Sequence, residues 1–186
     1  MANKKINFKD TQTYKNLQSA FSGEAAARVR YGFFSSVARK AGYIHTSKIF
    51  DIVSDQEKEH AEIWFKLLYN DSMPNLNECL KIAIGNEEYE YKNMYAEFAK
   101  TAKKEGFNDI ANKFLEVGKI EKTHEEKFNK ILTSIKSNDV FKNDKEIYWY
   151  CTNCGTLVKG KTAPKTCPVC SHPQGYFNKT TLKFDE

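Results

Sequence analysis

The chain has 186 residues, of which 40% are hydrophobic, 13% aromatic and 28% charged, and its formal net charge is +5. This length allows one medium-sized domain, or one domain with a small appendage. The lysines are scattered among glutamates, which argues against nucleic-acid binding, and no apolar run approaches the roughly 18 residues of a membrane helix.

Four stretches with apolar residues at helical spacing predict four long helices, each ending at a turn or loop signal. The expected helices cover about residues 11–40, 45–70, 76–105 and 108–136, with an irregularity near Gly85 in the third. Because the connections are short, residues 1–137 are expected to form an all-α, up-down-up-down four-helix bundle. The polar stretch 138–146 is expected to be a linker to residues 147–186.

Two of these helices carry the same motif, Glu-x-x-His. It occurs as Glu57 and His60 on the second helix and as Glu121 and His124 on the fourth. Positions i and i+3 lie on one helix face, so each carboxylate and imidazole could grip one metal ion. A charged, solvent-exposed face that happens to contain a histidine is the simpler explanation for either motif alone.

An internal repeat favours the metal interpretation. At an offset of 64 residues, Tyr31 to Tyr43 matches Tyr95 to Phe107, and the same offset carries Glu57 to Glu121 and His60 to His124. Both motifs therefore lie at equivalent points of two similar helix pairs, which chance would not arrange.

A binuclear site in a bundle also needs carboxylates from the other two helices. The first helix offers Glu24, which lies among small residues. The third offers Glu87, Glu88 and Glu90, and Glu87 and Glu90 share a face. Many carboxylates with one imidazole per metal suit iron or manganese rather than zinc.

The last part of the chain carries two Cys-x-x-Cys motifs, Cys151 with Cys154 and Cys167 with Cys170. Four thiolates at this spacing predict a tetrahedral metal site, which could hold iron or zinc. The fifth cysteine, Cys79, stands alone and is expected to be a small core residue. This pattern indicates a reducing compartment, and the N-terminus lacks the apolar segment of a signal peptide, so we expect a cytoplasmic protein.

Taken together, these motifs resemble the rubrerythrin family, a ferritin-like di-iron bundle followed by a rubredoxin-like Fe(Cys)₄ domain. The resemblance rests on GEAAARVRY, DQEKEHAEIWFKLL, EEYEYKNMY, EKTHEEKF, YWYCTNCG and CPVCSHPQGYF, in the family's order. It implies that Glu57 and Glu121 bridge the metals and that Tyr31 and Tyr95 orient ligand carboxylates. The di-iron ligands that the resemblance implies are Glu24, Glu57, His60, Glu87, Glu90, Glu121 and His124.

The repeat and the resemblance disagree on one ligand. The repeat pairs Glu24 with Glu88, since each stands seven residues before its tyrosine. The family pattern selects Glu87 and Glu90 instead, and we follow the family pattern.

The function that the resemblance implies is a peroxidase of oxidative stress defence, which reduces hydrogen peroxide at binuclear iron. Electrons would arrive through the C-terminal Fe(Cys)₄ site from rubredoxin or from an NAD(P)H-dependent flavoprotein. The family also implies a head-to-tail homodimer in which the ribbon of one subunit lies near the bundle of another. The alternative is a ferritin-like protein that oxidises and stores iron, with a structural zinc ribbon.

Overall fold

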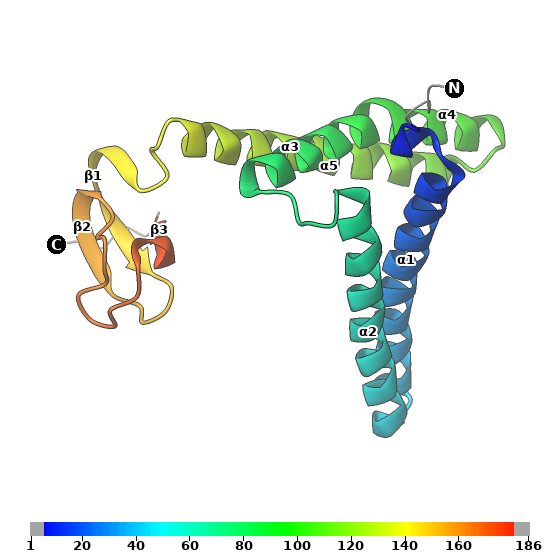
Figure 1. The fold of residues 1–186 in the computed structure, drawn as a ribbon, viewed down its shortest axis with the longest axis horizontal. Coiled ribbons are helices and arrows are strands. Elements are labelled where there is room, and N and C mark those ends of the chain that lie inside the picture. Colours follow the sequence, from blue (N-terminus) through cyan, green and yellow to red (C-terminus); the bar gives the residue numbers. More distant parts are fainter. Residues whose placement is uncertain (1–5, 181–186) are drawn as a thin grey trace, which may run out of the picture. The chain divides into compact units, whose positions relative to one another are not determined.

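The computed structural model describes residues 6–180 (Figure 1). Residues 1–5 and 181–186, at the outer ends of the first and last expected domains, lie outside the described residues. The chain divides into two compact units, Met1–Asn75 and Leu76–Glu186.

The first unit is an antiparallel pair of long helices, α1 (Gln12–Lys40) and α2 (Ile44–Leu68), preceded by a 3₁₀ turn (Phe8–Asp10) (Figure 1). Thr11 caps α1, because its hydroxyl oxygen accepts a hydrogen bond from the Tyr14 backbone N–H at 3.1 Å. The turn between the helices needs Gly42, whose φ of +85° lies in the left-handed region. Just beyond it the Tyr43 N–H donates to the Ala38 carbonyl at 2.9 Å.

The second unit begins with a third helical segment in three parts. They are α3 (Leu76–Tyr89), a π-helical turn (Glu90–Met94) and α4 (Tyr95–Lys104). The segment packs against α5 (Asn108–Lys136). The irregularity expected near Gly85 was therefore misplaced: α3 runs through Gly85 without a break, and the distortion comes at the π-turn.

The repeat is visible in the structure. Gly106, at a φ of +88°, closes the turn before α5 as Gly42 does before α2, and the Phe107 N–H donates to the Ala102 carbonyl at 2.8 Å. Each helix pair also contains a three-ring cluster at equivalent positions, with ring centroids 5.5–6.4 Å apart. The clusters are Tyr31, Phe34 and Phe50 in the first unit and Tyr95, Phe98 and Phe114 in the second.

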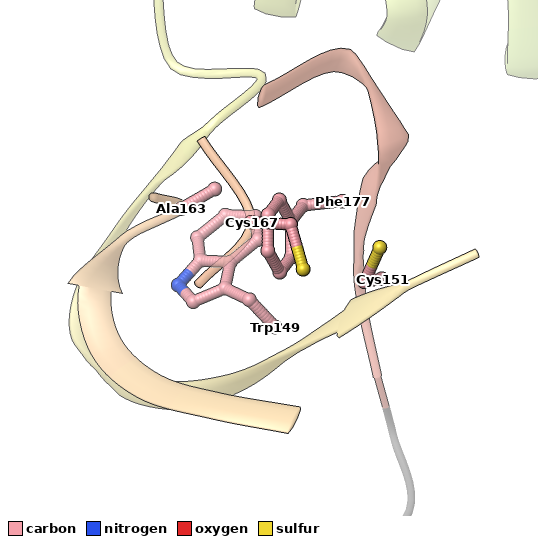
Figure 2. Packing of buried hydrophobic residues seen from close by; sticks show 5 residues of the cluster. All are labelled: Trp149, Cys151, Ala163, Cys167 and Phe177. Carbon is pink, nitrogen blue, oxygen red and sulfur yellow. The ribbon is translucent and has the colours of Figure 1, made fainter. Parts of the chain in front are cut away.

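The C-terminal ribbon is a three-stranded antiparallel sheet in the order β2-β1-β3, formed by β1 (Lys142–Cys151), β2 (Leu157–Thr162) and β3 (Phe177–Lys179). Its core gathers around Trp149, which is completely buried and donates from Nε1 to the Gly160 carbonyl at 3.0 Å. Figure 2 shows Ala163 on one side of the indole ring and Phe177 with the two cysteines on the other. Two of the four metal-binding thiols therefore belong to the core itself.

Three sequence expectations can be compared with these elements. The expected fold class is confirmed: four long helical segments precede a small ribbon with four clustered cysteines. Strand β1 starts at Lys142, inside the segment 138–146 expected to be a linker, because polar Lys142 pairs with Thr162. Cys79 is exposed, so its expected place in a core was wrong. Across the part of the chain that the structure describes, no helix is long and apolar enough to cross a membrane.

Candidate metal centres

The first candidate site lies between α1 and α2. Donor atoms of Glu24, Glu57 and His60 all lie within 4.8 Å of one another. The His60 Nδ1 is 2.8 Å from the Glu57 Oε2 and 4.0 Å from the Glu24 Oε2. The Glu57 side chain is only 16% exposed, whereas the His60 side chain is 52% exposed, so the carboxylate of the motif is mostly buried and its imidazole is open to solvent.

The second candidate site repeats the first between α3 and α5. Donor atoms of Glu87, Glu121 and His124 again lie within 4.8 Å of one another. The His124 Nδ1 is 2.8 Å from the Glu121 Oε2 and 3.5 Å from the Glu87 Oε2. Each unit thus carries two carboxylates and one imidazole, and the Glu-x-x-His pair of each lies at the same position of the repeat.

The π-turn decides which glutamate of the third helical segment faces α5. Glu24 stands seven residues before Tyr31, whereas Glu87 stands eight before Tyr95, and a π-turn accommodates one extra residue within a helix. Glu87 therefore takes the place that the uninterrupted repeat would give to Glu88. Glu88 instead forms an ion pair with Lys92 on the helix surface.

The second cluster is short of positive charge. Burial raises the pKa of the Glu87 carboxyl, and a hydrogen bond to Glu121 and the negative charges of Glu121 and Glu90 raise it further. A bound cation would offset the repulsion between carboxylates that lie this close together. Their oxygen-rich donor set with one imidazole fits iron or manganese. The donor set therefore fits a di-iron centre.

Of the remaining predicted residues, Glu90 and Tyr95 belong to the unit of the second cluster and Tyr31 to the first unit. Glu90 lies in the π-turn, outside the group within 4.8 Å, although its charge acts on Glu87. Tyr95 begins α4, and burial, followed by the charges of Glu90, Glu121 and Glu87, raises the pKa of its phenol. In the first unit, Tyr31 packs against Phe50 with ring centroids 6.2 Å apart.

The third candidate site is the cysteine cluster of the ribbon. Its four sulfurs lie within 4.8 Å of one another, with Cys151 Sγ 3.7 Å from Cys170 Sγ and Cys154 Sγ 3.6 Å from Cys167 Sγ. A tetrahedral ion with metal–sulfur bonds of about 2.3 Å has sulfur–sulfur edges of about 3.8 Å. The four thiols are therefore already spaced for a tetrahedral metal.

Two similar turns present these sulfurs. The Gly155 N–H donates to the Cys151 carbonyl at 2.9 Å, and the Ser171 N–H donates to the Cys167 carbonyl at 3.0 Å. The residue after each second cysteine has a left-handed backbone, with φ of +81° at Gly155 and +61° at Ser171. Glycine adopts this conformation at little cost, whereas serine is strained there.

Hydrogen bonds to sulfur lower the pKa of two of the four thiols, whereas burial and the hydrogen bonds to Cys154 and Cys167 raise the pKa of the Cys170 thiol to about 11. A bond from the Cys170 backbone holds the pKa of the Cys167 thiol at about 6, although burial opposes the shift. The Thr156 hydroxyl, 3.1 Å from the Cys154 Sγ, lowers the pKa of that thiol. Thr156 was not among the sequence candidates; its place two residues after a cysteine was the available signal.

Comparison with known proteins assigns both parts of the chain. A family model described as rubrerythrin matches residues 15–77 and 78–159, and one described as the rubrerythrin rubredoxin-like domain matches residues 149–178. The chain belongs to the rubrerythrin family. It is 39% identical to rubrerythrin-1 of Clostridium acetobutylicum, covering 92% of this chain and 95% of that one. It is 41% identical to the rubrerythrin of Porphyromonas gingivalis, covering 92% and 91% of the two chains.

A solved structure of partially reduced nigerythrin is also similar, with 24% identity, coverage of 97% of this chain and 91% of that one, and a TM-score of 0.35. This score is too low to add to the assignment. The sequence-based assignment to the rubrerythrin family is confirmed by the family models and relatives, and the Cys₄ cluster and the glutamate–histidine groups suit its iron sites.

Proposed function

We propose that this chain is a peroxidase that reduces hydrogen peroxide to two molecules of water with two electrons and two protons. Above all, the proposal is supported by one observation: carboxylate–carboxylate–imidazole clusters at equivalent positions of both repeats, in a chain that also carries four clustered thiols. Two ferrous ions held by the helices would supply both electrons, and iron in the ribbon would return them one at a time.

The proposed ligands of the helical centre share carboxylate or imidazole donors and come from all four helical segments. Glu57 and Glu121 are the proposed bridging carboxylates, and their nearly buried side chains are 16% and 14% exposed. We propose this complete ligand set: Glu24, Glu57, His60, Glu87, Glu90, Glu121 and His124.

Two tyrosines have proposed orienting roles beside these ligands. The Tyr95 phenol is protonated at neutral pH, as a tyrosine ordinarily is, and its raised pKa holds the proton more tightly, so it can donate a hydrogen bond to a neighbouring carboxylate. Tyr31 has the same proposed role in the first repeat.

The ribbon gives the chain a place to receive electrons. Iron in a four-cysteine site takes up one electron at a time. Such a carrier is useful to a two-electron centre only if that centre turns over repeatedly. The proposed donor is rubredoxin or an NAD(P)H-dependent flavoprotein, and the proposed assembly is a head-to-tail homodimer in which the ribbon of one subunit serves the helices of the other. We also propose a cytoplasmic location, where a reducing environment keeps the thiols available to a metal.

Rapid mixing tests this function. The iron-loaded protein is reduced anaerobically and mixed with hydrogen peroxide or with dioxygen, while the red absorbance of oxidised Fe(Cys)₄ is followed. We expect the colour to return faster with peroxide than with dioxygen. If dioxygen reacts faster, or if the ribbon never turns red because it holds zinc, iron oxidation and storage becomes the better account.

A further inference from the structure

Gly118 lies on α5 opposite Tyr95 of the third helical segment. It is buried in the middle of α5, and a Cβ built on it would lie 3.3 Å from the Tyr95 Cβ. Such a contact is closer than an ordinary van der Waals contact, so one of the two helices would have to move by a few tenths of an ångström. Among the residues that the structure describes, no other glycine has a neighbour this close.

The equivalent position of the first repeat carries a side chain, unlike Gly118. At the offset of 64 residues, Gly118 corresponds to Ser54, whose hydroxyl donates to the Arg28 carbonyl of α1 at 2.8 Å. The first helix pair therefore accommodates a side chain at this position. The third helical segment differs from α1 by the π-turn, which ends directly before Tyr95.

A hydrogen bond links this contact to the second cluster. The Tyr95 N–H donates to the Glu90 carbonyl, five residues earlier, which is the bond that defines a π-turn. A shift of the Tyr95 backbone is therefore passed to Glu90. Glu90 begins the π-turn, close enough to Glu87 for its charge to act on that carboxyl.

We propose that Gly118 is a positioning residue for the second carboxylate cluster. By presenting no side chain, it lets the end of the π-turn lie against α5, and so fixes where Glu90 stands relative to Glu87, Glu121 and His124. Metal sites hold their ligands within about 0.5 Å of the productive geometry, so a displacement of a few tenths of an ångström would use up most of that tolerance. This inference deepens the proposed function and rests on the helices binding iron.

Anaerobic titration with ferrous iron tests the proposal on the full-length protein, whose ribbon is first filled with Zn²⁺. We expect Gly118→Ala to weaken iron binding by the helices roughly 10- to 100-fold. The matched control is Gly85→Ala in α3, where an added methyl group meets nothing within 4 Å. Far-UV circular dichroism of the metal-free variants checks that both remain helical. Equal affinities of wild type and Gly118→Ala would overturn the proposal.

A second background separates positioning from a general loss of stability. In Tyr95→Gly the facing Cβ is absent, so adding Gly118→Ala should change the iron affinity by less than about twofold. If Gly118→Ala alone fails to fold, recovery of helicity in the double variant carries the same information. If Gly118→Ala weakens iron binding as much in the Tyr95→Gly background as it does alone, the proposed contact is contradicted. If the helices of the wild-type protein bind no iron, the proposed function is refuted instead.

Discussion

Glu87 and His124, which come from different helices, face each other with 3.5 Å between the carboxylate Oε2 and the imidazole Nδ1. Glu88, the next residue, pairs with Lys92 on the surface. We therefore expect Glu87→Gln to weaken iron binding by the helices by at least roughly 10-fold and Glu88→Gln to leave it unchanged. Metal analysis after anaerobic loading makes this comparison. Loss of iron from the Glu88 variant alone would reverse our assignment.

The stability of the metal-free protein should depend on pH, because the carboxyl groups of the second cluster lie close together. The raised pKa of Glu87 means that the folded state holds its proton more tightly than the unfolded state does. The contribution of Glu87 to stability is therefore present below the ordinary carboxyl pKa and is lost as the pH rises through the raised value.

Urea unfolding of the metal-free protein at several pH values measures this effect. Relative to wild type, Glu87→Gln should gain stability as the pH rises from about 4 to 7, because it carries no charge to bury. Glu88→Gln is the matched control and should show no such gain. A wild-type–variant difference that is the same at every pH would contradict the assigned environment of Glu87.

Ser35 and Ser47 hydrogen-bond to each other at 2.9 Å between α1 and α2, and both are buried. Ser35→Ala should cost about 1–3 kcal/mol of unfolding free energy, because the Ser47 hydroxyl loses its partner. The double variant Ser35→Ala, Ser47→Ala should recover most of this loss. The second repeat naturally has two alanines in place of these serines, since Ala99 and Ala111 occupy the equivalent buried positions. Strictly additive losses in a double-mutant cycle by thermal unfolding would refute the pairing.

The ribbon should depend strongly on its one buried tryptophan. Trp149→Ala removes the centre of the ribbon core and should cost about 3–5 kcal/mol, observed as loss of the metal–thiolate absorbance at lower denaturant concentration. Tyr150→Ala is the control, because its side chain, 39% exposed, lies outside that core. Equal effects of the two substitutions would mean that the metal alone holds the ribbon together.

The features that sequence could predict are those with a fixed spacing. An i, i+3 pair must share a helix face, so Glu57 with His60 and Glu121 with His124 were expected to meet, and they do. The two Cys-x-x-Cys motifs were equally explicit, and their sulfurs cluster.

The features that sequence could not predict depend on where one residue is inserted or which neighbour approaches. The π-turn after Tyr89 leaves no compositional mark, so the repeat alone pointed to Glu88 and the distortion was expected at Gly85. The close approach of Gly118 to Tyr95 arises from packing between helices, which no local pattern encodes.

The central claim is that both helix pairs and the ribbon hold iron in one peroxide-reducing circuit. Anaerobic titration of the fully reduced protein with hydrogen peroxide tests it most directly, with the red colour of the ribbon as the indicator. Three ferrous ions give up three electrons and each peroxide takes two, so the end point should come at about 1.5 molecules of peroxide per chain. An end point near 0.5, with only the ribbon oxidised, would contradict the claim.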